Sequence, residues 1–171
     1  NMNATALGLN GGWGGITVTK QFVNKFEAST RNGNNEPTAW NDKRAMFHTD
    51  GQTFESTDYV KDFTKGGYAV TKFKNITSTG VAGKDPAKDF PDTDLPLIRL
   101  AEVYLTYAEA VLRGGTGGDR ATALGYINQL RTRGYGSIAG NIADADLTLD
   151  FILDERAREL YWEGLRRTDL I

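Results

Sequence analysis

The chain has 171 residues, of which 39% are hydrophobic and 11% aromatic, enough to form one domain with a real core. Its 20 basic and 22 acidic residues give a net charge of -2 at pH 7, which excludes nucleic acid and anionic membranes as expected partners. The absence of Cys excludes disulfides and Cys-based zinc sites, and no run of about 18 apolar residues could span a bilayer.

Residues 1–95 predict a loop-rich region with a short helix and strands. The stretch "TKQFVNKFEAS" is typical of a short helix that Thr19 caps and whose inward face carries Phe22, Val23 and Phe26. In "GGYAVTKFKN", Tyr68 and the alternate residues after it follow the period of a strand. Between these segments, stretches rich in Gly, Asn, Asp and Pro predict long loops, which commonly carry binding sites.

Residues 96–171 predict helices. In "PLIRLAEVYLTYAEAVLRGG", Pro96 suits the first turn and Gly114 the end of a helix. Its apolar side chains recur at a helical period and share one face: Leu97, Ala101, Tyr104, Ala108 and Val111. We therefore expect this face to lie in the core.

Two further helices are predicted. "DRATALGYINQLRTRG" has Asp119 as N-cap, Gly134 as its stop, and one apolar face formed by Ala123, Ile127 and Leu130. The short linker "GGTGG" predicts that this helix is antiparallel to the preceding one, and the pair spans about the 34 residues of a tetratricopeptide unit. The third helix is expected from Leu147 to the end of the chain, with an aligned stripe of Leu149, Leu153, Ala157, Leu160 and Gly164.

The basic residues are distributed unevenly, because all nine lysines precede Pro96 and nine of the eleven arginines follow it. Arg offers a planar fork that holds carboxylates in partly buried networks. We expect pairs one turn apart on the helices: Glu155 with Arg158, Glu163 with Arg166 and Arg167, and Glu102 with Arg99. Such pairing lowers a carboxylate pKa, which is the wrong direction for a general acid, so we interpret these acids as structural.

Enzymatic chemistry has little support in the sequence. His48 is the only histidine, and HExxH, P-loop and GxSxG motifs are absent, so we expect no metal site and no cofactor. A glycosidase would need two carboxylates about 5 to 10 Å apart. The loop acids Asp50, Glu55, Asp58 and Asp62 are candidates for such a pair, with solvated surface as the favoured interpretation.

Trp13 is the main candidate for ligand contact. It lies in "GLNGGWGG", where double glycines on both sides leave the indole without neighbouring side chains. Sugars stack on such rings, and Asn10 could add hydrogen bonds. The alternative is that Trp13 fills the core while the glycines form a turn. Trp40, in "PTAWNDKRAMF", is a third candidate, although its context favours the core.

Several of these blocks resemble one known family in order and spacing. "LPLIRLAEVYLTYAEAVLRGG", "ALGYINQLRTRG" and "ILDERARELYWEGLRRTDLI" closely resemble the signature blocks of the SusD/RagB family, and "NDKRAMF" and "GGYAVTKFKN" resemble the segment before them. The resemblance implies a right-handed helical scaffold. It also implies that an acid and Arg network ties the last helix to its neighbours, through Glu155, Arg156, Glu159, Glu163, Arg167 and Asp169.

The resemblance implies a function as well. Members are surface lipoproteins of the outer membrane in Bacteroidetes-type bacteria. They bind glycans or other nutrients without catalysis, through aromatic side chains on loops, and deliver them to a SusC-like TonB-dependent transporter. The membrane contact would be made only through a lipid anchor outside this chain.

Family members are much longer than this chain, so we expect residues 1–171 to form a single SusD-like C-terminal region of a longer protein. The fold expected is mainly α with loop-rich segments, a few short strands, a tetratricopeptide-like helical hairpin and one further helix. The competing interpretation is a tetratricopeptide-like module that binds another protein and no sugar.

Overall fold

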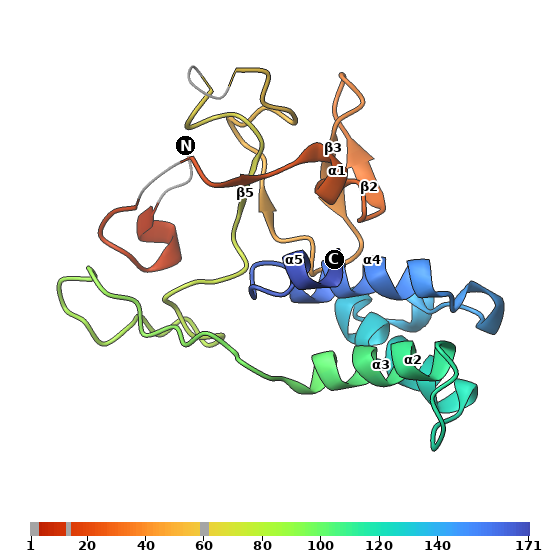
Figure 1. The fold of residues 1–171 in the computed structure, drawn as a ribbon. Helices are drawn as coiled ribbons and strands as arrows, with labels where there is room; N and C mark the ends of the chain where they lie inside the picture. The colour runs from red at the N-terminus through yellow and green to blue at the C-terminus, as the bar shows by residue number, and fades with distance from the viewer. Residues whose placement is uncertain (1–3, 13–14, 59–61) are drawn as a thin grey trace. The chain divides into compact units, whose positions relative to one another are not determined.

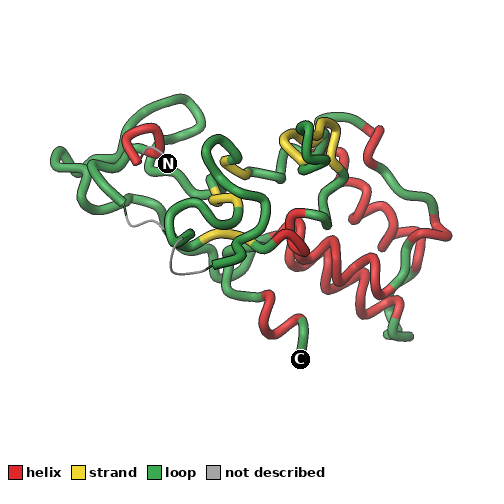
Figure 2. The backbone as a smooth tube through the Cα atoms, turned by 90° about the horizontal axis from the view of Figure 1, so that it is seen from above, coloured by secondary structure: helices red, strands yellow, loops and turns green. Residues whose placement is uncertain are grey.

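The structure is a computed structural model that describes residues 4–12, 15–58 and 62–171, and its backbone divides into two compact units (Figure 1). The first unit contains the described residues up to Asn24, Thr30–Thr38 and Met46–Leu95. The second contains Lys25–Ser29, Ala39–Ala45 and Pro96–Ile171. Figure 2 shows that loops make up most of the first unit and helices most of the second.

The first unit is built on a small antiparallel sheet of three strands in the order β1-β5-β4. Its central strand β5 (Tyr68–Val70) pairs with β1 (Thr17–Val18) on one side and β4 (Phe47–His48) on the other. All three residues of β5 are buried. The predicted strand in residues 66–75 therefore exists, but it is short because each partner strand offers only two residues.

Two short helical turns complete the first unit, the 3-10 turn η1 (Ala4–Leu7) and the helix α1 (Lys20–Val23). The predicted cap of α1 is confirmed, since the side chain of Thr19 accepts a hydrogen bond from the backbone N of Phe22 at 3.3 Å. The inward face is also confirmed at Val23, which is fully buried.

The strands β2 (Ala28–Arg31) and β3 (Pro37–Trp40) form a two-stranded sheet of their own. Asn32 organises the turn between them, because its Oδ1 accepts hydrogen bonds from the backbone N of Asn34 and of Glu36, each at 3.0 Å. Asn35 adopts a φ of 62°, a conformation that Asn tolerates better than most residues. This turn lies in a stretch that the sequence predicts as a loop.

The second unit contains the first two predicted helices as α2 (Leu100–Leu112) and α3 (Arg120–Tyr135). Asp119 caps α3 as expected, accepting from the backbone N of Thr122 at 2.8 Å. The expected stop at Gly134 is wrong by one half-turn: Gly134 is buried within the helix, and Gly136 ends it with a left-handed φ of 71°.

Two 3-10 turns, η2 (Ile138–Gly140) and η3 (Asp144–Asp146), lead from α3 to α4 (Leu149–Leu160). Thr148 caps α4 by accepting from the backbone N of Phe151 at 3.1 Å. The expectation that this helix runs to the end of the chain is wrong. It ends at Tyr161, whose backbone is extended, and the chain turns before the short α5 (Arg166–Asp169).

The directions of the three long helices follow from their side-chain contacts. Arg99, just before α2, and Arg133, near the end of α3, both bind Glu159, so α2 and α3 run antiparallel as predicted. Arg131 and Arg133 bind Glu155 and Glu159 in the same order along α4, so α3 and α4 run in the same direction.

A hydrophobic core lies among these helices. Its buried members come from α2, α3, α4 and the segment before α4: Ala101, Leu105, Ala108, Ala123, Ile127, Leu130, Leu147, Ile152 and Leu160. The predicted faces of α3 and of the middle of α2 are thus confirmed. Leu97 was expected in the core but is 82% exposed, because α2 begins only at Leu100. Among the described residues, no helix has the length and apolar character needed to span a membrane.

Candidate functional site

Buried acids and arginines form an ionic network in the second unit, centred on α4. Glu155 is fully buried and binds three arginines: its Oε1 accepts from Arg44 at 2.7 Å, and its Oε2 accepts from Arg131 and Arg158 at 2.8 Å each. Burial acts to raise the pKa of Glu155, but the positive charges of Arg44, Arg158 and Arg131 outweigh it and lower the pKa. Glu155 is therefore held ionised.

Glu159, one turn further along α4, is the second centre of the network. Its carboxylate accepts from Arg99 at 2.6 Å and from Arg44 at 3.0 Å, and it also binds Arg133. Burial again acts to raise the pKa of this acid. Hydrogen bonds from Arg133 and Arg99 outweigh the effect of burial and lower the pKa of Glu159 to about 2.

The pairing expected within single turns of the helices is confirmed for Glu155 with Arg158 only. Arg99 was expected to bind Glu102, but its guanidinium instead binds Glu163 at 2.7 and 2.9 Å in addition to Glu159. Glu163 follows the end of α4, and its carboxylate accepts both of these bonds from Arg99. The fold, and not closeness in the sequence, thus determines which carboxylate Arg99 binds.

Three further contacts extend the network. Arg156 binds Asp169 at 2.8 Å, which ties α4 to α5. Asp42 is buried and binds Arg44 at 2.7 Å, and the hydroxyl of Tyr161 donates to the backbone O of Arg44 at 2.7 Å. The network implied by the resemblance therefore exists at Glu155, Arg156, Glu159, Glu163 and Asp169. Arg167 lies outside it, because its side chain is exposed.

The sequence analysis missed four members of this network, Asp42, Arg44, Arg131 and Arg133, and Arg44 is the most central of them. It lies 111 residues from Glu155 and 115 from Glu159, so no local spacing could signal the contact. The only available signal was its position in "NDKRAMF", a block that already resembles the family. Every carboxylate in this network is bound by Arg, which makes it a scaffold and not an acid catalyst.

The first unit has a hollow of about 330 Å³, which is in the size class of small-molecule sites. It is lined by residues 15–21 and by residues before and at the start of β5: Gly15, Ile16, Thr17, Val18, Thr19, Lys20, Gln21, Phe54, Glu55, Ser56 and Gly67. Lys20 and Glu55 form an ion pair of 2.6 Å in this lining, and both side chains are partly exposed. The hollow thus offers charged groups, hydroxyls and an aromatic ring together.

An exposed aromatic side chain lies beside this hollow. Phe63 is 58% exposed, and its ring packs directly on Gly15, where a Cβ atom would come within 2.4 Å of the ring. Gly15 also has a φ of 95°, so both the space and the backbone conformation require glycine here. Gly15, the last glycine of "GGWGG", therefore makes room for an aromatic ring at the surface.

The three predicted ligand-binding residues have different outcomes. Trp13 lies outside the described residues. Asn10 is exposed in the first unit, where its backbone N donates to the backbone O of Lys88 at 3.0 Å. Trp40 lies at the end of β3 in the second unit, half-buried, with its Nε1 buried. Their role in binding stays a prediction.

Comparison with known proteins decides the family. Residues 2–171 match the model of the SusD family. The chain belongs to the SusD family. It is 40% identical over 133 residues to the starch-binding protein SusD of Bacteroides thetaiotaomicron. The resemblance found in the sequence is thereby confirmed.

Solved SusD superfamily structures share the fold. A protein from Bacteroides vulgatus matches with a TM-score of 0.52 and 31% identity over 76% of this chain, and one from Bacteroides thetaiotaomicron matches with the same score and identity over 80%. The predicted fold class, mainly helical with long loops and a few short strands, is confirmed. The tetratricopeptide-like character of the α2 and α3 pair stays a prediction.

This SusD-family chain corresponds to only part of its relatives. The match covers 76% of the chain but 22% of the starch-binding protein, and 25% and 27% of the two solved structures.

Proposed function

We propose that this chain is part of a non-catalytic carbohydrate-binding protein at the cell surface. The observation that carries the proposal is its 40% identity to a protein named for starch binding, within a family match that spans residues 2–171. In this proposal the protein is held at the outer membrane by a lipid anchor and passes its ligand to a SusC-like TonB-dependent transporter.

The hollow of the first unit is the proposed place of carbohydrate contact within this chain. Sugars are recognised by aromatic faces together with a few placed polar groups. The hollow supplies the polar groups through Thr17, Ser56 and the pair of Lys20 and Glu55, and Phe63 supplies an exposed ring beside it. Trp13, two residues before Gly15 in the sequence, is proposed to add a second ring, with Asn10 as a further contact of the first unit. Trp40 is proposed as a separate sugar contact of the second unit.

The test is calorimetric titration with a panel of starch, xylan, mannan and host-type oligosaccharides, repeated with Trp13→Ala and Phe63→Ala. An aromatic platform contributes about 0.5–1.5 kcal/mol beyond area burial, so losing one should weaken binding several-fold at an unchanged thermal midpoint. Trp162→Ala is the matched control, because it removes a partly exposed tryptophan of the second unit. No binding by the folded chain to any member of the panel would contradict the proposal.

One observation favours the alternative of a protein-binding module. Several large apolar side chains at the start of α2 are exposed: Leu97, Ile98, Leu100 and Val103. Such a patch is typical of a surface that contacts protein. A chain that binds no sugar but co-purifies stoichiometrically with a transporter through this patch would favour the alternative, and Leu97→Ser with Ile98→Ser should then abolish the complex.

A further inference from the structure

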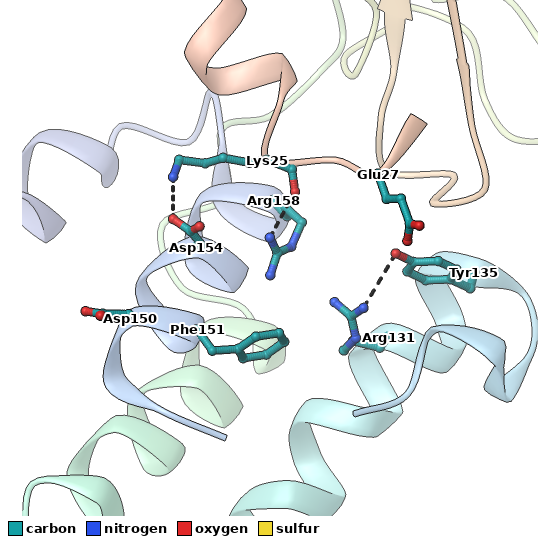
Figure 3. Close-up of a pocket in the computed structure, with 8 residues that line it drawn as sticks. All are labelled: Lys25, Glu27, Arg131, Tyr135, Asp150, Phe151, Asp154 and Arg158. Carbon is teal, nitrogen blue, oxygen red and sulfur yellow. Dashed lines mark hydrogen bonds and ion pairs between the residues drawn. The ribbon is translucent and has the colours of Figure 1, made fainter. Parts of the chain in front are cut away.

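A second cavity lies in the second unit, between α3, α4 and the segment from Lys25 to Glu27 (Figure 3). Its volume of about 290 Å³ is at the lower end of the range of small-molecule sites, roughly 300–1,000 Å³. A cavity of this size accommodates a single sugar unit rather than an oligosaccharide. Nothing in the proposed starch-like binding of the first unit uses it.

Two buried guanidinium groups point toward the middle of this cavity, Arg131 from α3 and Arg158 from α4 (Figure 3). Both hydrogen bond to the same oxygen, Oε2 of Glu155, and the other oxygen of that carboxylate is occupied by Arg44. Two positive charges thus share one carboxylate oxygen. The inner wall of the cavity is therefore electropositive.

These guanidinium groups retain donors that could bind a ligand. Arg158 uses Nε for Glu155 and Nη1 for the backbone O of Lys25, and its Nη2 has no partner among the residues that the structure describes. Nη2 of Arg131 reaches only the hydroxyl of Tyr135, at a long 3.5 Å. Arg158 is 8% exposed, and Nη2 belongs to the accessible part of its side chain, so this donor is open to a ligand that enters the cavity.

The ring of Phe151 fixes the positions of both groups. Each guanidinium carbon lies 5.3 Å from the centre of the Phe151 ring, within the distance of a cation–π contact. The two arginines are thereby held in place before any ligand arrives. Guanidinium groups held in place in this way bind best to a planar acceptor with two oxygens, such as a carboxylate.

The rim of the cavity has the opposite character. Lys25 and Asp154 form an ion pair there, while Glu27 and Asp150 are exposed carboxylates. Carboxylates accept hydrogen bonds and donate none, so the rim selects ligands whose outer groups are donors. The cavity is therefore suited to a ligand with an anionic group on the inner side and hydroxyl or similar donors at the rim.

We propose that this cavity binds one hexuronic acid unit, with its carboxylate between Arg131 and Arg158 and a hydroxyl donating to Glu27 at the rim. The proposal rests on the carbohydrate-binding function proposed above and adds an acidic sugar as a ligand of the second unit. A free zwitterion such as an amino acid offers the same carboxylate, but all its N–H donors lie on one nitrogen next to that carboxylate, whereas the hydroxyls of a sugar extend toward the rim.

The test is an NMR titration of the chain with methyl glucuronide, methyl glucoside and alanine. We expect saturable shifts with the glucuronide, strongest at the amides of Arg131, Phe151 and Arg158, and at least ten-fold weaker binding of the other two compounds. Arg158→Gln should weaken glucuronide binding at least ten-fold. Arg113→Gln, which removes an exposed Arg of α2 outside the cavity, should leave it unchanged.

Arg158 also binds Glu155, so Arg158→Gln can fail to fold. In that case the test is which amide signals of the unaltered chain shift when glucuronide is added. Shifts from glucuronide that fall outside the cavity residues overturn the inference. Equal affinity for the glucoside shows that the carboxylate is not recognised, and equal affinity for alanine shows that the sugar is not, so either result also overturns it.

The inference and the proposed function can fail separately. If neutral oligosaccharides bind the chain and glucuronide does not, the inference is overturned while the proposed function stands. If glucuronide binds in the cavity and no neutral oligosaccharide binds anywhere, the inference is supported and the first-unit hollow loses its proposed role.

Discussion

The two units differ in what holds them together. The second unit packs three helices around an apolar core and adds a buried network in which Glu155 and Glu159 each bind several arginines. The first unit has a three-stranded sheet whose outer strands are two residues long, and its loops are fixed mainly by hydrogen bonds to the backbone. Stability is thus concentrated in one unit, and the other carries adaptable surface, as loops on a scaffold commonly do.

The largest expected effect tests the buried network against an exposed pair. Glu155→Gln leaves three arginines around a neutral amide, and breaking a buried ion pair in this way costs about 3–5 kcal/mol of unfolding free energy. Glu109→Gln, which removes the exposed pair with Arg113 on α2, should cost less than about 0.5 kcal/mol. Urea denaturation measures both, and similar losses would show that the network contributes no more than a surface pair.

The cores of the two units can be compared by truncation. Leu105→Ala on α2 removes a fully buried side chain, and we expect a loss of about 3 kcal/mol. Val23→Ala on α1 removes fewer carbons from an equally buried site and should cost about 1–2 kcal/mol. The urea midpoints of the two variants check this order, and a larger loss for Val23→Ala would contradict it.

Acid should weaken the network through Glu159. Its pKa falls from 4.5 to about 2 on folding, so its stabilisation is complete above pH 4.5 and is lost as the pH falls toward 2. A shift of this size corresponds to about 3 kcal/mol. Urea midpoints between pH 6 and pH 2 should fall more steeply for the unaltered chain than for Glu159→Gln.

The control for this pH experiment lies in the first unit. Backbone N–H groups, that of Phe90 foremost, lower the pKa of Asp85, which is partly exposed and lies outside the arginine network. Asp85→Asn should therefore flatten the acid slope less than Glu159→Gln does. If both variants reduce the pH dependence of the urea midpoint equally, the acid sensitivity comes from carboxylates in general and not from the network.

The smallest expected effect compares two threonine caps. Thr148→Ala removes the N-cap of α4 and should cost about 1 kcal/mol. Thr19→Ala removes the N-cap of α1, a helix of four residues, and should cost less because fewer helical bonds depend on it. Thermal unfolding of the two variants, with Thr→Ser replacements as controls that retain the hydroxyl, ranks the caps.

The sequence predicted the second unit well where local patterns decide. The period of Ala123, Ile127 and Leu130 identified the buried face of α3, and Asp119 identified its start. The prediction from sequence failed where contacts with residues far along the chain determine the structure. Gly134 reads as a helix stop, but its lack of a side chain instead makes room for Arg44, since a Cβ there would lie 2.6 Å from Nε of that residue.

The first unit was predicted less completely, for a related reason. Its strands are too short for alternation to be visible, so only β5 was found from its pattern. Among the site residues, Phe63 has no local signal beyond being aromatic, and its relation to Gly15 depends on the fold. Trp13 and Asn10 were selected from glycine spacing alone, and their ligand contacts remain to be measured.

The wide sequence separation between Arg44 and Glu155 has a consequence for how the protein is made. A ribosome that has synthesised Arg44 must add 111 more residues before its carboxylate partner exists. During that interval Asp42 is the one carboxylate of the described network that has been made, because Glu155, Glu159, Glu163 and Asp169 all come later in the sequence. Domains generally fold as units during synthesis, so the second unit can complete its fold only after α4 has left the ribosomal exit tunnel. Until then the apolar faces of α2 and α3 are exposed, and this is the stage at which chaperones bind most readily.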